Sequence, residues 1–303
     1  MVGAGYVGRT TALRIVERGM ADVCLIDVIE GWPQGLALDL SHSAPIQRFE
    51  VRVTGANDYK KAAGAHVVVV TAGLARTPGM SRLDLANSNK AIIEKVAAEV
   101  AEHCPEAVVV VVTNPLDEMT YWFAEKSGFP KQRVMGMAGL LDSARLCSYI
   151  AEELKVSPLS VDAITLGSHG EDMVPLPRLA TVDGRPLTEL LDESALKSLF
   201  ERTVGAGAEV VSLLGNASAF YAPSAAVAKM VNAITGDSKE VLPVSAWVTG
   251  QYGVNETYLG VPARLGRKGV EEIIELDLDD QELGNLKAAA NAISKRCVDL
   301  QAG

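Results

Sequence analysis

Gly3-Ala4-Gly5-Tyr6-Val7-Gly8 is the stretch that decides the fold, because its three glycines form the pattern G-x-G-x-x-G. The pattern predicts a tight turn from a strand into a helix, whose unpaired first amides bind a pyrophosphate. Gly3 permits the turn, Gly5 lets the main chain approach the phosphates, and Gly8 allows close packing of helix and strand. The stretch therefore predicts a dinucleotide site at the start of the chain.

The residues that follow decide between such a site and a glycine-rich turn that binds nothing. A helical pattern covers residues 9–18, an apolar strand covers 23–26, and Asp27 follows Gly8 by 19 residues. An acid at this distance accepts hydrogen bonds from ribose hydroxyls and repels a 2′-phosphate. This context favours a dinucleotide site over an empty turn, and NAD over NADP.

Only Met1 and Val2 precede the glycines, so the strand expected there is almost absent. In a doubly wound sheet that strand is central. We therefore expect either a chain truncated at its start or a displaced start, and the sequence leaves both open.

The composition is that of a soluble globular protein. Of the 303 residues, 48% are hydrophobic and 22% charged, and the formal net charge is −10. This charge disfavours nucleic acid and anionic membranes as partners, and no apolar run approaches the ~20 residues of a membrane helix. No signal peptide is visible, and the four cysteines lack the regular spacing that is typical of a disulfide framework. We therefore expect a cytoplasmic protein with free thiols.

The pattern of elements divides the chain into two parts. Up to about residue 135, apolar strands alternate with helices, as a parallel sheet covered on both faces requires. The second part mixes helices with stretches at 241–248, 258–265 and 269–278 that we expect to pair antiparallel. The predicted fold is α/β, with a Rossmann doubly wound parallel sheet over residues 1–138 and an α+β substrate lobe over residues 139–303.

Polar side chains that follow buried strands are candidate site residues, because ligands of open α/β sheets lie beyond the carboxyl ends of the strands. Arg76 and Arg82 share a loop that also carries Pro78 and Gly79. Such a loop can bring cations over a bound anion, although two solvated arginines explain it equally well. Asn114 is either a contact to cofactor or substrate or a polar cap of the next turn.

His169 is a candidate general acid/base. It follows a strand predicted over 162–167 and lies between small residues in Gly-Ser-His-Gly-Glu, although a structural histidine is the more ordinary interpretation. A catalytic imidazole needs an orienting carboxylate, and Asp142 is the candidate. Asp142 and Arg145 are three apart on a predicted helix and share a face, so Arg145 is placed to hold a carboxylate. Asp142 as a helix N-cap is an equally good alternative.

Together these motifs resemble the malate/lactate dehydrogenase family, most closely its lactate-dehydrogenase-like malate dehydrogenases. The resemblance covers essentially the whole chain and its blocks are specific. They are Gly-Ala-Gly-Tyr-Val-Gly (3–8), Thr-Ala-Gly-Leu-Ala-Arg-Thr-Pro-Gly-Met-Ser-Arg (71–82), Thr-Asn-Pro-Leu-Asp (113–117), Gly-Met-Ala-Gly-Leu-Leu-Asp-Ser-Ala-Arg (136–145), Gly-Ser-His-Gly-Glu (167–171) and Ser-Ala-Phe-Tyr-Ala-Pro (218–223).

The resemblance implies a role for each candidate. His169 takes the hydroxyl proton while hydride passes to the nicotinamide, and Asp142 holds the imidazole. Arg145 binds the first carboxylate of the substrate, and Arg82 polarises its carbonyl. Arg76 occupies the position that is usually glutamine in relatives acting on lactate, so it implies a second carboxylate, as in malate and oxaloacetate. An unpaired arginine there is costly, so pyruvate should be rejected.

The resemblance also implies an NAD site and an oligomer. Asn114 would contact both substrate and cofactor. The implied NAD contacts are Gly3, Gly5, Tyr6, Val7, Gly8, Asp27, Asn89, Val112 and Asn114. Family members of this type are dimers or tetramers, and no metal is implied.

Two departures from the family pattern lie beside the histidine. The family usually shows Gly-Gly-His-Gly-Asp, whereas this chain has Ser168 and Glu171. These residues leave His169 intact but alter its surroundings. The sequence predicts an NAD-dependent dehydrogenase of malate, with a dehydrogenase of another 2-hydroxy acid and a catalytically silent nucleotide-binding protein as alternatives.

Overall fold

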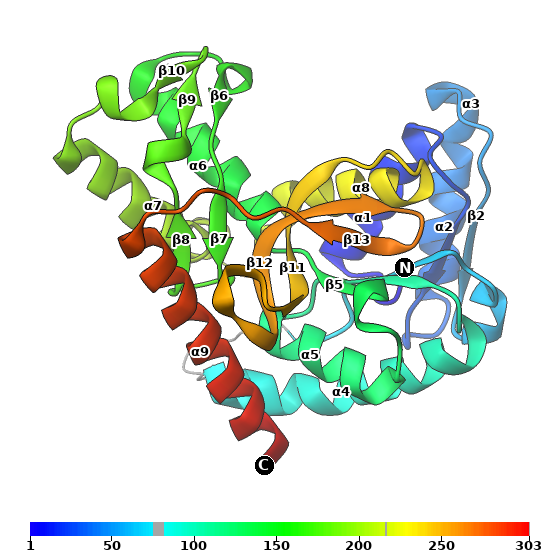
Figure 1. Cartoon of the computed structure of the whole chain (residues 1–303). Coiled ribbons are helices and arrows are strands. Elements are labelled where there is room, and N and C mark those ends of the chain that lie inside the picture. Colours follow the sequence, from blue (N-terminus) through cyan, green and yellow to red (C-terminus); the bar gives the residue numbers. More distant parts are fainter. Residues whose placement is uncertain (75–81, 216, 303) are drawn as a thin grey trace.

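The computed structural model describes residues 1–74, 82–215 and 217–302 (Figure 1). In the first half, strands alternate with helices as predicted. The strands are β1 (Val23–Ile26), β2 (Val53–Ala56), β3 (Val67–Val70), β4 (Val108–Val111) and β5 (Val134–Gly136). β1 pairs parallel with β2, and β4 pairs parallel with both β3 and β5. The predicted doubly wound parallel sheet is confirmed.

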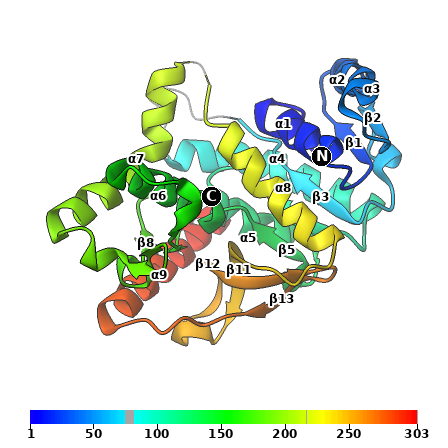
Figure 2. The same cartoon turned by 90° about the horizontal axis from the view of Figure 1, so that it is seen from above.

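The two faces of this sheet are covered by different helices. α1 (Tyr6–Glu17) and α8 (Tyr221–Thr235) pack together on one face, and α4 (Arg82–His103) and α5 (Leu116–Ser127) pack together on the other (Figures 1 and 2). Because side chains alternate along a strand, Val69 of β3 joins the cluster with α1 and α8, whereas Val68 joins the cluster with α4 and α5. Runs of valine suit strands that are buried on both faces.

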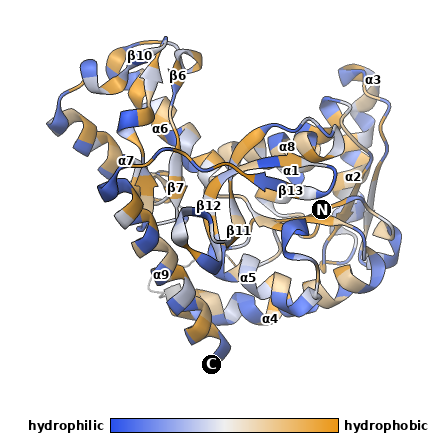
Figure 3. Ribbon diagram, in the orientation of Figure 1, coloured by the Kyte–Doolittle hydropathy of each residue, from blue (hydrophilic) through white to orange (hydrophobic). Residues whose placement is uncertain are grey.

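The remaining helices lie at the edge of this sheet or in the second half. They are α2 (Trp32–His42), α3 (Ala44–Gln47), α6 (Gly139–Leu154), α7 (Glu193–Leu214) and α9 (Asp280–Ala302). Short 3₁₀ turns are η1 (Tyr59–Ala62), η2 (Lys131–Arg133), η3 (Pro158–Ser160), η4 (Pro177–Leu179), η5 (Leu187–Glu189) and η6 (Gln251–Gly253). α4 and α9 carry both hydrophobic and hydrophilic residues along their length (Figure 3), as helices between a core and water do.

The second half continues the sheet of the first. β11 (Val241–Thr249), β12 (Asn255–Gly266) and β13 (Gly269–Ile273) pair antiparallel, as predicted. β11 also pairs with β5, through Ser245 and Gly136, so the strand order runs β3-β4-β5-β11-β12-β7-β8. The expected boundary after residue 138 is therefore crossed by one continuous sheet.

The single strand predicted over 162–167 was wrong. It is divided into β6 (Val161–Asp162) and β7 (Thr165–Gly167), which belong to different sheets. β6 pairs with β9 (Thr181–Val182), and β9 pairs with β10 (Arg185–Pro186). β7 instead pairs with β12 and with β8 (Met173–Pro175). The division follows from these distant partners, which no local pattern reveals.

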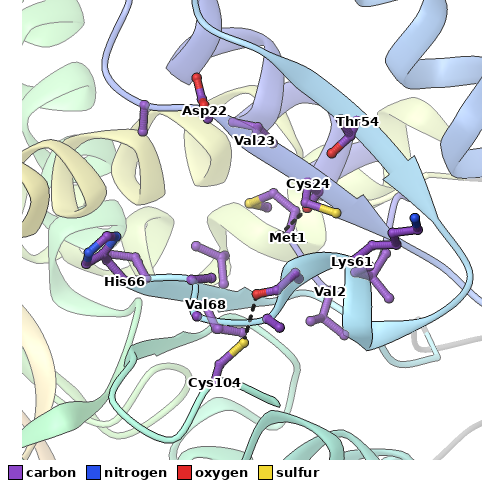
Figure 4. A pocket seen from close by; sticks show the side chains of 18 of the residues that line it. Met1, Val2, Asp22, Val23, Cys24, Thr54, Lys61, His66, Val68 and Cys104 are labelled. Carbon is purple, nitrogen blue, oxygen red and sulfur yellow. Dashed lines mark hydrogen bonds between the residues drawn. The ribbon is translucent and has the colours of Figure 1, made fainter.

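The first strand is reduced to one bridging residue, in line with the expectation that it is almost absent. Val2 bridges Ile26 of β1 and Val70 of β3. Beyond Met1, a cavity of about 540 Å³ separates β1 from β3 (Figure 4). The α-amino group of Met1 donates a hydrogen bond of 2.8 Å to the carbonyl oxygen of Cys24.

Two further features concern membrane-spanning helices and disulfide bonds. None of the helices that the structure describes is long and apolar enough to cross a membrane. All four cysteines are free thiols, and Cys104 and Cys297 are buried.

Candidate active site

His169 lies in the tight turn that connects β7 to β8. Gly167 has φ +84° and Gly170 has φ +144°, conformations that favour glycine. A Cβ atom on Gly167 would lie 2.8 Å from the carbonyl oxygen of Asp172, so the turn closes too tightly for a side chain there. The glycines on either side of the histidine therefore shape the turn that presents it.

Asp142 holds the imidazole of His169. Its Oδ2 lies 2.8 Å from Nδ1 of His169, and its side chain is only 2% exposed. α6 begins at Gly139 and has no side-chain cap, so the alternative of Asp142 as an N-cap was wrong. The predicted pairing of this carboxylate with His169 is present in the structure.

Arg145 lies one helical turn further along α6. Its Nη1 donates to Oδ1 of Asp142 over 3.3 Å, and its side chain is 15% exposed. The carboxylate of Asp142 is thus shared between His169 and Arg145, as their spacing predicts. Among the described residues no other acceptor binds the guanidinium of Arg145, which leaves donors for an incoming carboxylate.

The pKa of His169 is raised above its ordinary value of 6.5. Burial acts to lower this pKa, but the negative charge of Asp142 and its hydrogen bond outweigh the burial. The charge of Arg145 lowers the pKa and that of Asp117 raises it, both to a smaller extent. The site therefore favours an imidazolium, which is the form that donates a proton.

A second carboxylate, Asp117, lies behind the histidine and was missed as a site residue from the sequence. Its Oδ2 accepts from the main-chain amide of His169 at 3.0 Å and from Oγ of Ser168 at 2.8 Å. Its Oδ1 accepts from Oγ of Ser245 at 2.8 Å. The motif Thr-Asn-Pro-Leu-Asp contains Asp117, but the three donors come from distant parts of the chain.

The glycine loop has the form that a dinucleotide site requires. Gly3 has φ +95°, and a Cβ atom on Gly8 would lie 2.0 Å from the carbonyl oxygen of Gly3. A Cβ atom on Gly5 would meet nothing within 4 Å, so this glycine faces open space at the start of α1. The first amides of a helix have no acceptor within it, so those of α1 can donate to a ligand.

Asp27 lies at the end of β1 beside the same loop. Its Oδ2 accepts from the amide of Ala4 at 2.7 Å, and its Oδ1 accepts from the amide of Ile29 at 3.1 Å. Each carboxylate oxygen accepts more than one hydrogen bond, so both retain capacity for ribose hydroxyls. The structure thus places the predicted acid beside the glycines.

Asn89 links the loops that follow β3 and β4. Its side chain is completely buried. Its Oδ1 accepts from the amide of Leu74 at 2.7 Å, and its Nδ2 donates to the carbonyl oxygen of Leu74 at 3.1 Å and to that of Asn114 at 2.7 Å. These bonds give Asn89 a structural role, and its contact with the cofactor stays a prediction.

The other predicted positions are placed as follows. Tyr6 is exposed at the start of α1 and stacks on Phe220, and Val7 is half-buried beside it. Val112 is half-buried at the end of β4, and Asn114 is exposed two residues later. They stay predictions as cofactor contacts.

The structure does not test the predicted roles of Arg76 and Arg82. Arg76 lies outside the described residues. Arg82 is the first residue of α4, and its side chain lies outside what the structure describes.

Comparison with known proteins finds matching family models and close relatives of the chain. Family models of the lactate/malate dehydrogenase NAD binding domain and alpha/beta C-terminal domain match residues 1–136 and 140–301. Malate dehydrogenase of Chloroherpeton thalassium is 47% identical over 98% of this chain and 96% of that protein.

Solved structures agree with this placement. Malate dehydrogenase of Cryptosporidium parvum superimposes with a TM-score of 0.97 at 39% identity, covering 100% of this chain and 98% of that chain. Lactate dehydrogenase of the same organism, solved with lactic acid and nicotinamide adenine dinucleotide, has a TM-score of 0.96 at 37% identity, covering 100% of this chain and 97% of that chain. The main chain alone therefore does not separate the two substrates.

Proposed function

Because this chain belongs to the lactate/malate dehydrogenase family, we propose that it is an NAD-dependent malate dehydrogenase. It interconverts (S)-malate and oxaloacetate. The observation that carries the proposal is the single carboxylate of Asp142 shared between His169, at 2.8 Å, and Arg145, at 3.3 Å. This arrangement joins an acid/base group to a cation for a substrate carboxylate.

His169 and Asp142 carry out the proton transfer. Neutral His169 accepts the hydroxyl proton of malate, and the imidazolium returns that proton to the carbonyl oxygen of oxaloacetate. Asp142 fixes Nδ1 as the protonated nitrogen and stabilises the imidazolium. Nε2 is then the nitrogen that exchanges a proton with the substrate.

Three arginines are proposed to recognise the substrate. Arg145 holds the carboxylate next to the reacting carbon as a two-pronged pair. Arg82 polarises the carbonyl oxygen, and Arg76 pairs with the second carboxylate, which lactate and pyruvate lack. Asn114 orients substrate against cofactor. The support for Arg76, Arg82 and Asn114 is their match to the family motifs.

The residues of the glycine loop fit NAD. Gly5 borders open space at the start of α1, which supports binding of a pyrophosphate by the first amides of this helix. The hydrogen bond from the amide of Ala4 holds Asp27 beside the same loop, which supports a role in binding the ribose. When bound, NAD supplies the acceptor for the hydride of malate. The negative charge of Asp27 supports the choice of NAD over NADP, because it would repel a 2′-phosphate.

We also propose a homo-oligomer, a dimer or tetramer, in the cytoplasm. The oligomer is proposed from the family resemblance. The four free thiols support a reducing compartment.

The substrate is tested by comparing kcat/KM for oxaloacetate and pyruvate, each with NADH. We expect oxaloacetate to be preferred by about 10³-fold or more, because pyruvate leaves the cation of Arg76 unpaired. Arg76→Gln should reduce this preference by a similar factor, whereas Arg48→Gln, at an exposed position, should not. A preference for pyruvate would indicate a different 2-hydroxy acid, and no turnover of any 2-oxo acid would indicate a silent nucleotide-binding protein.

A further inference from the structure

The family usually has a glycine before the histidine, where this chain has Ser168. The hydroxyl group of Ser168 both donates and accepts a hydrogen bond. It donates to Oδ2 of Asp117 over 2.8 Å and accepts from Nη2 of Arg296 over 3.0 Å. The serine is only 2% exposed, so both bonds are shielded from water. A glycine at this position would form neither bond.

Arg296 brings the C-terminal helix α9 to the turn that carries His169. Besides Ser168, its Nη1 donates to Oδ2 of Asp172 over 2.8 Å and its Nε donates to Oε1 of Glu118 over 2.6 Å. Asp172 lies at the far end of the turn. One guanidinium therefore holds the turn at both ends and anchors it to α5 through Glu118, whose side chain is 3% exposed.

Asp117 connects Ser168, and through it Arg296, to the main chain of His169. The oxygen that accepts from Ser168 also accepts from the amide of His169 at 3.0 Å. A shift of the serine hydroxyl would therefore displace the carboxylate that fixes the main chain of the histidine. An imidazole that must meet a substrate oxygen within a fraction of an ångström is sensitive to such displacement.

We propose that Arg296 is a positioning residue for His169, acting from the C-terminal helix through Ser168 and Asp117. The inference rests on the proposed function, since it assigns His169 the acid/base role. It adds to that function a connection between α9 and the reacting group that the Ser168 of this chain creates. Among the described residues, Arg296 binds Glu118, Asp172 and Ser168, and none of these is assigned to the substrate.

The connection has an electrostatic consequence as well as a geometric one. His169 is faced by Asp142 and Arg145 from α6 and by Asp117 from α5, and Glu171 and Asp172 lie on its own turn. Burial raises the pKa of Asp117, the charge of Glu118 raises it further, and hydrogen bonds such as that from Ser168 lower it.

Loss of the serine hydroxyl removes one of the hydrogen bonds that lower the pKa of Asp117, so this pKa should rise. Because the negative charge of Asp117 helps to raise the pKa of His169, any loss of that charge should lower the pKa of His169.

The test uses the full chain with three variants and one control. Ser168→Ala removes the link with little change of volume. Arg296→Lys keeps a cation for the buried Glu118 but cannot form all three bonds. The third variant combines the two. Lys295→Gln removes a cation at the neighbouring exposed position of α9 and serves as the matched control.

Two readouts separate positioning from mere support of the fold. Turnover of malate with saturating NAD should fall about fivefold in each single variant, the order of effect of one lost hydrogen bond, with KM for NAD unchanged. The double variant should fall no further, because both changes break the same link. The midpoint of the titration of the labelled His169 imidazole, followed by NMR, should move to lower pH in Ser168→Ala and not in Lys295→Gln.

The proposal is overturned if the single variants only lower the melting temperature, while turnover and the His169 titration stay as in the parent. It is also overturned if the two losses multiply in the double variant, or if Arg296→Lys behaves as Lys295→Gln does. A parent without turnover contradicts the proposed function instead, and the imidazole titration then still decides whether Arg296 acts on His169.

Discussion

Asp142 is the residue at which the parts of the site meet, because one oxygen binds His169 and the other binds Arg145. Burial lowers the pKa of His169, but the charge of Asp142 and its hydrogen bond together outweigh the burial and raise this pKa. Asp142 also restrains the arginine proposed to bind the substrate. Removing this charge should therefore change both the rate and its dependence on pH.

Asp142→Asn should lower kcat by about 10²- to 10⁴-fold, the range of general acid/base contributions. Reduction of oxaloacetate needs the imidazolium, so its rate is lost as pH rises through the pKa of His169. The variant loses the charge that raises this pKa, so the loss of rate should move to lower pH. Profiles from about pH 5 to 9 measure this, and Asp162→Asn, at an exposed position, is the control. A variant with the parent's profile would contradict the role of Asp142.

Asp27→Ser should relax the preference for NAD over NADP. The serine no longer repels a 2′-phosphate, and it lacks the two charged carboxylate oxygens that would accept from the ribose hydroxyls. The ratio of kcat/KM for the two cofactors should fall about tenfold or more, as expected for one removed like-charge contact, and Asp39→Ser on the exposed face of α2 should leave it unchanged. Equal use of NAD and NADP by the parent would contradict the assignment.

Local motifs revealed some site residues and not others. The spacing of Asp142 and Arg145 on one helix face and the glycines around His169 are local, and the structure brings these three together. Asp117 was missed because its partners Ser168 and Ser245 lie 51 and 128 residues away. Only the folded sheet brings such groups together, so no spacing rule could predict them.

At the scale of elements, the strands that are buried on both faces could be predicted from the sequence, because they are runs of valine. β3 and β4 are both Val-Val-Val-Val, and their parallel pairing followed from the alternation with helices. The division of 162–167 into β6 and β7 was not predictable, since it depends on pairing with β9 and with β12.

The cavity between β1 and β3 leads to a prediction about stability. The α-amino group of Met1 is buried and its pKa is lowered by that burial. Alternate residues of a strand bond to opposite neighbours, so the main-chain amides of Cys24, Val67 and Val69 also face the cavity. These exposed edges on both sides are what an additional parallel strand would pair with.

An extension of four β-branched residues, Thr-Val-Ile-Val, joined to the nitrogen of Met1 should fill this cavity. The melting temperature should rise by about 5 °C or more, since each kcal/mol gained shifts it by about 2–4 °C in a chain of this size. The matched control is Gly-Ser-Gly-Ser, of equal length. An equal melting temperature for both extensions would show that the cavity does not accept a strand.

At the scale of the whole molecule, the sheet that begins at β3 continues without a break into β11, β12 and β7. The glycine loop, which follows the bridge between Val2 and Val70 of β3, and the turn that carries His169 are therefore attached to one sheet, although the family models divide the chain between residues 136 and 140. Asp117, just after β4, binds the turn that carries His169 and connects the two halves at the site.

Light scattering should give a mass of two or four chains. This expectation rests on the resemblance to family members that are dimers or tetramers. The mass of a single chain at micromolar concentration would contradict the proposed homo-oligomer.

The central claim is that His169 and Arg145, joined through Asp142, act on a dicarboxylate that lies against the nicotinamide. A crystal structure with NAD and a malate analogue tests it most directly. We predict Nε2 of His169 within about 2.6–3.2 Å of the hydroxyl or carbonyl oxygen, Arg145 on one carboxylate and Arg76 on the other. A dicarboxylate bound away from His169, or a second carboxylate that Arg76 does not touch, would contradict the account.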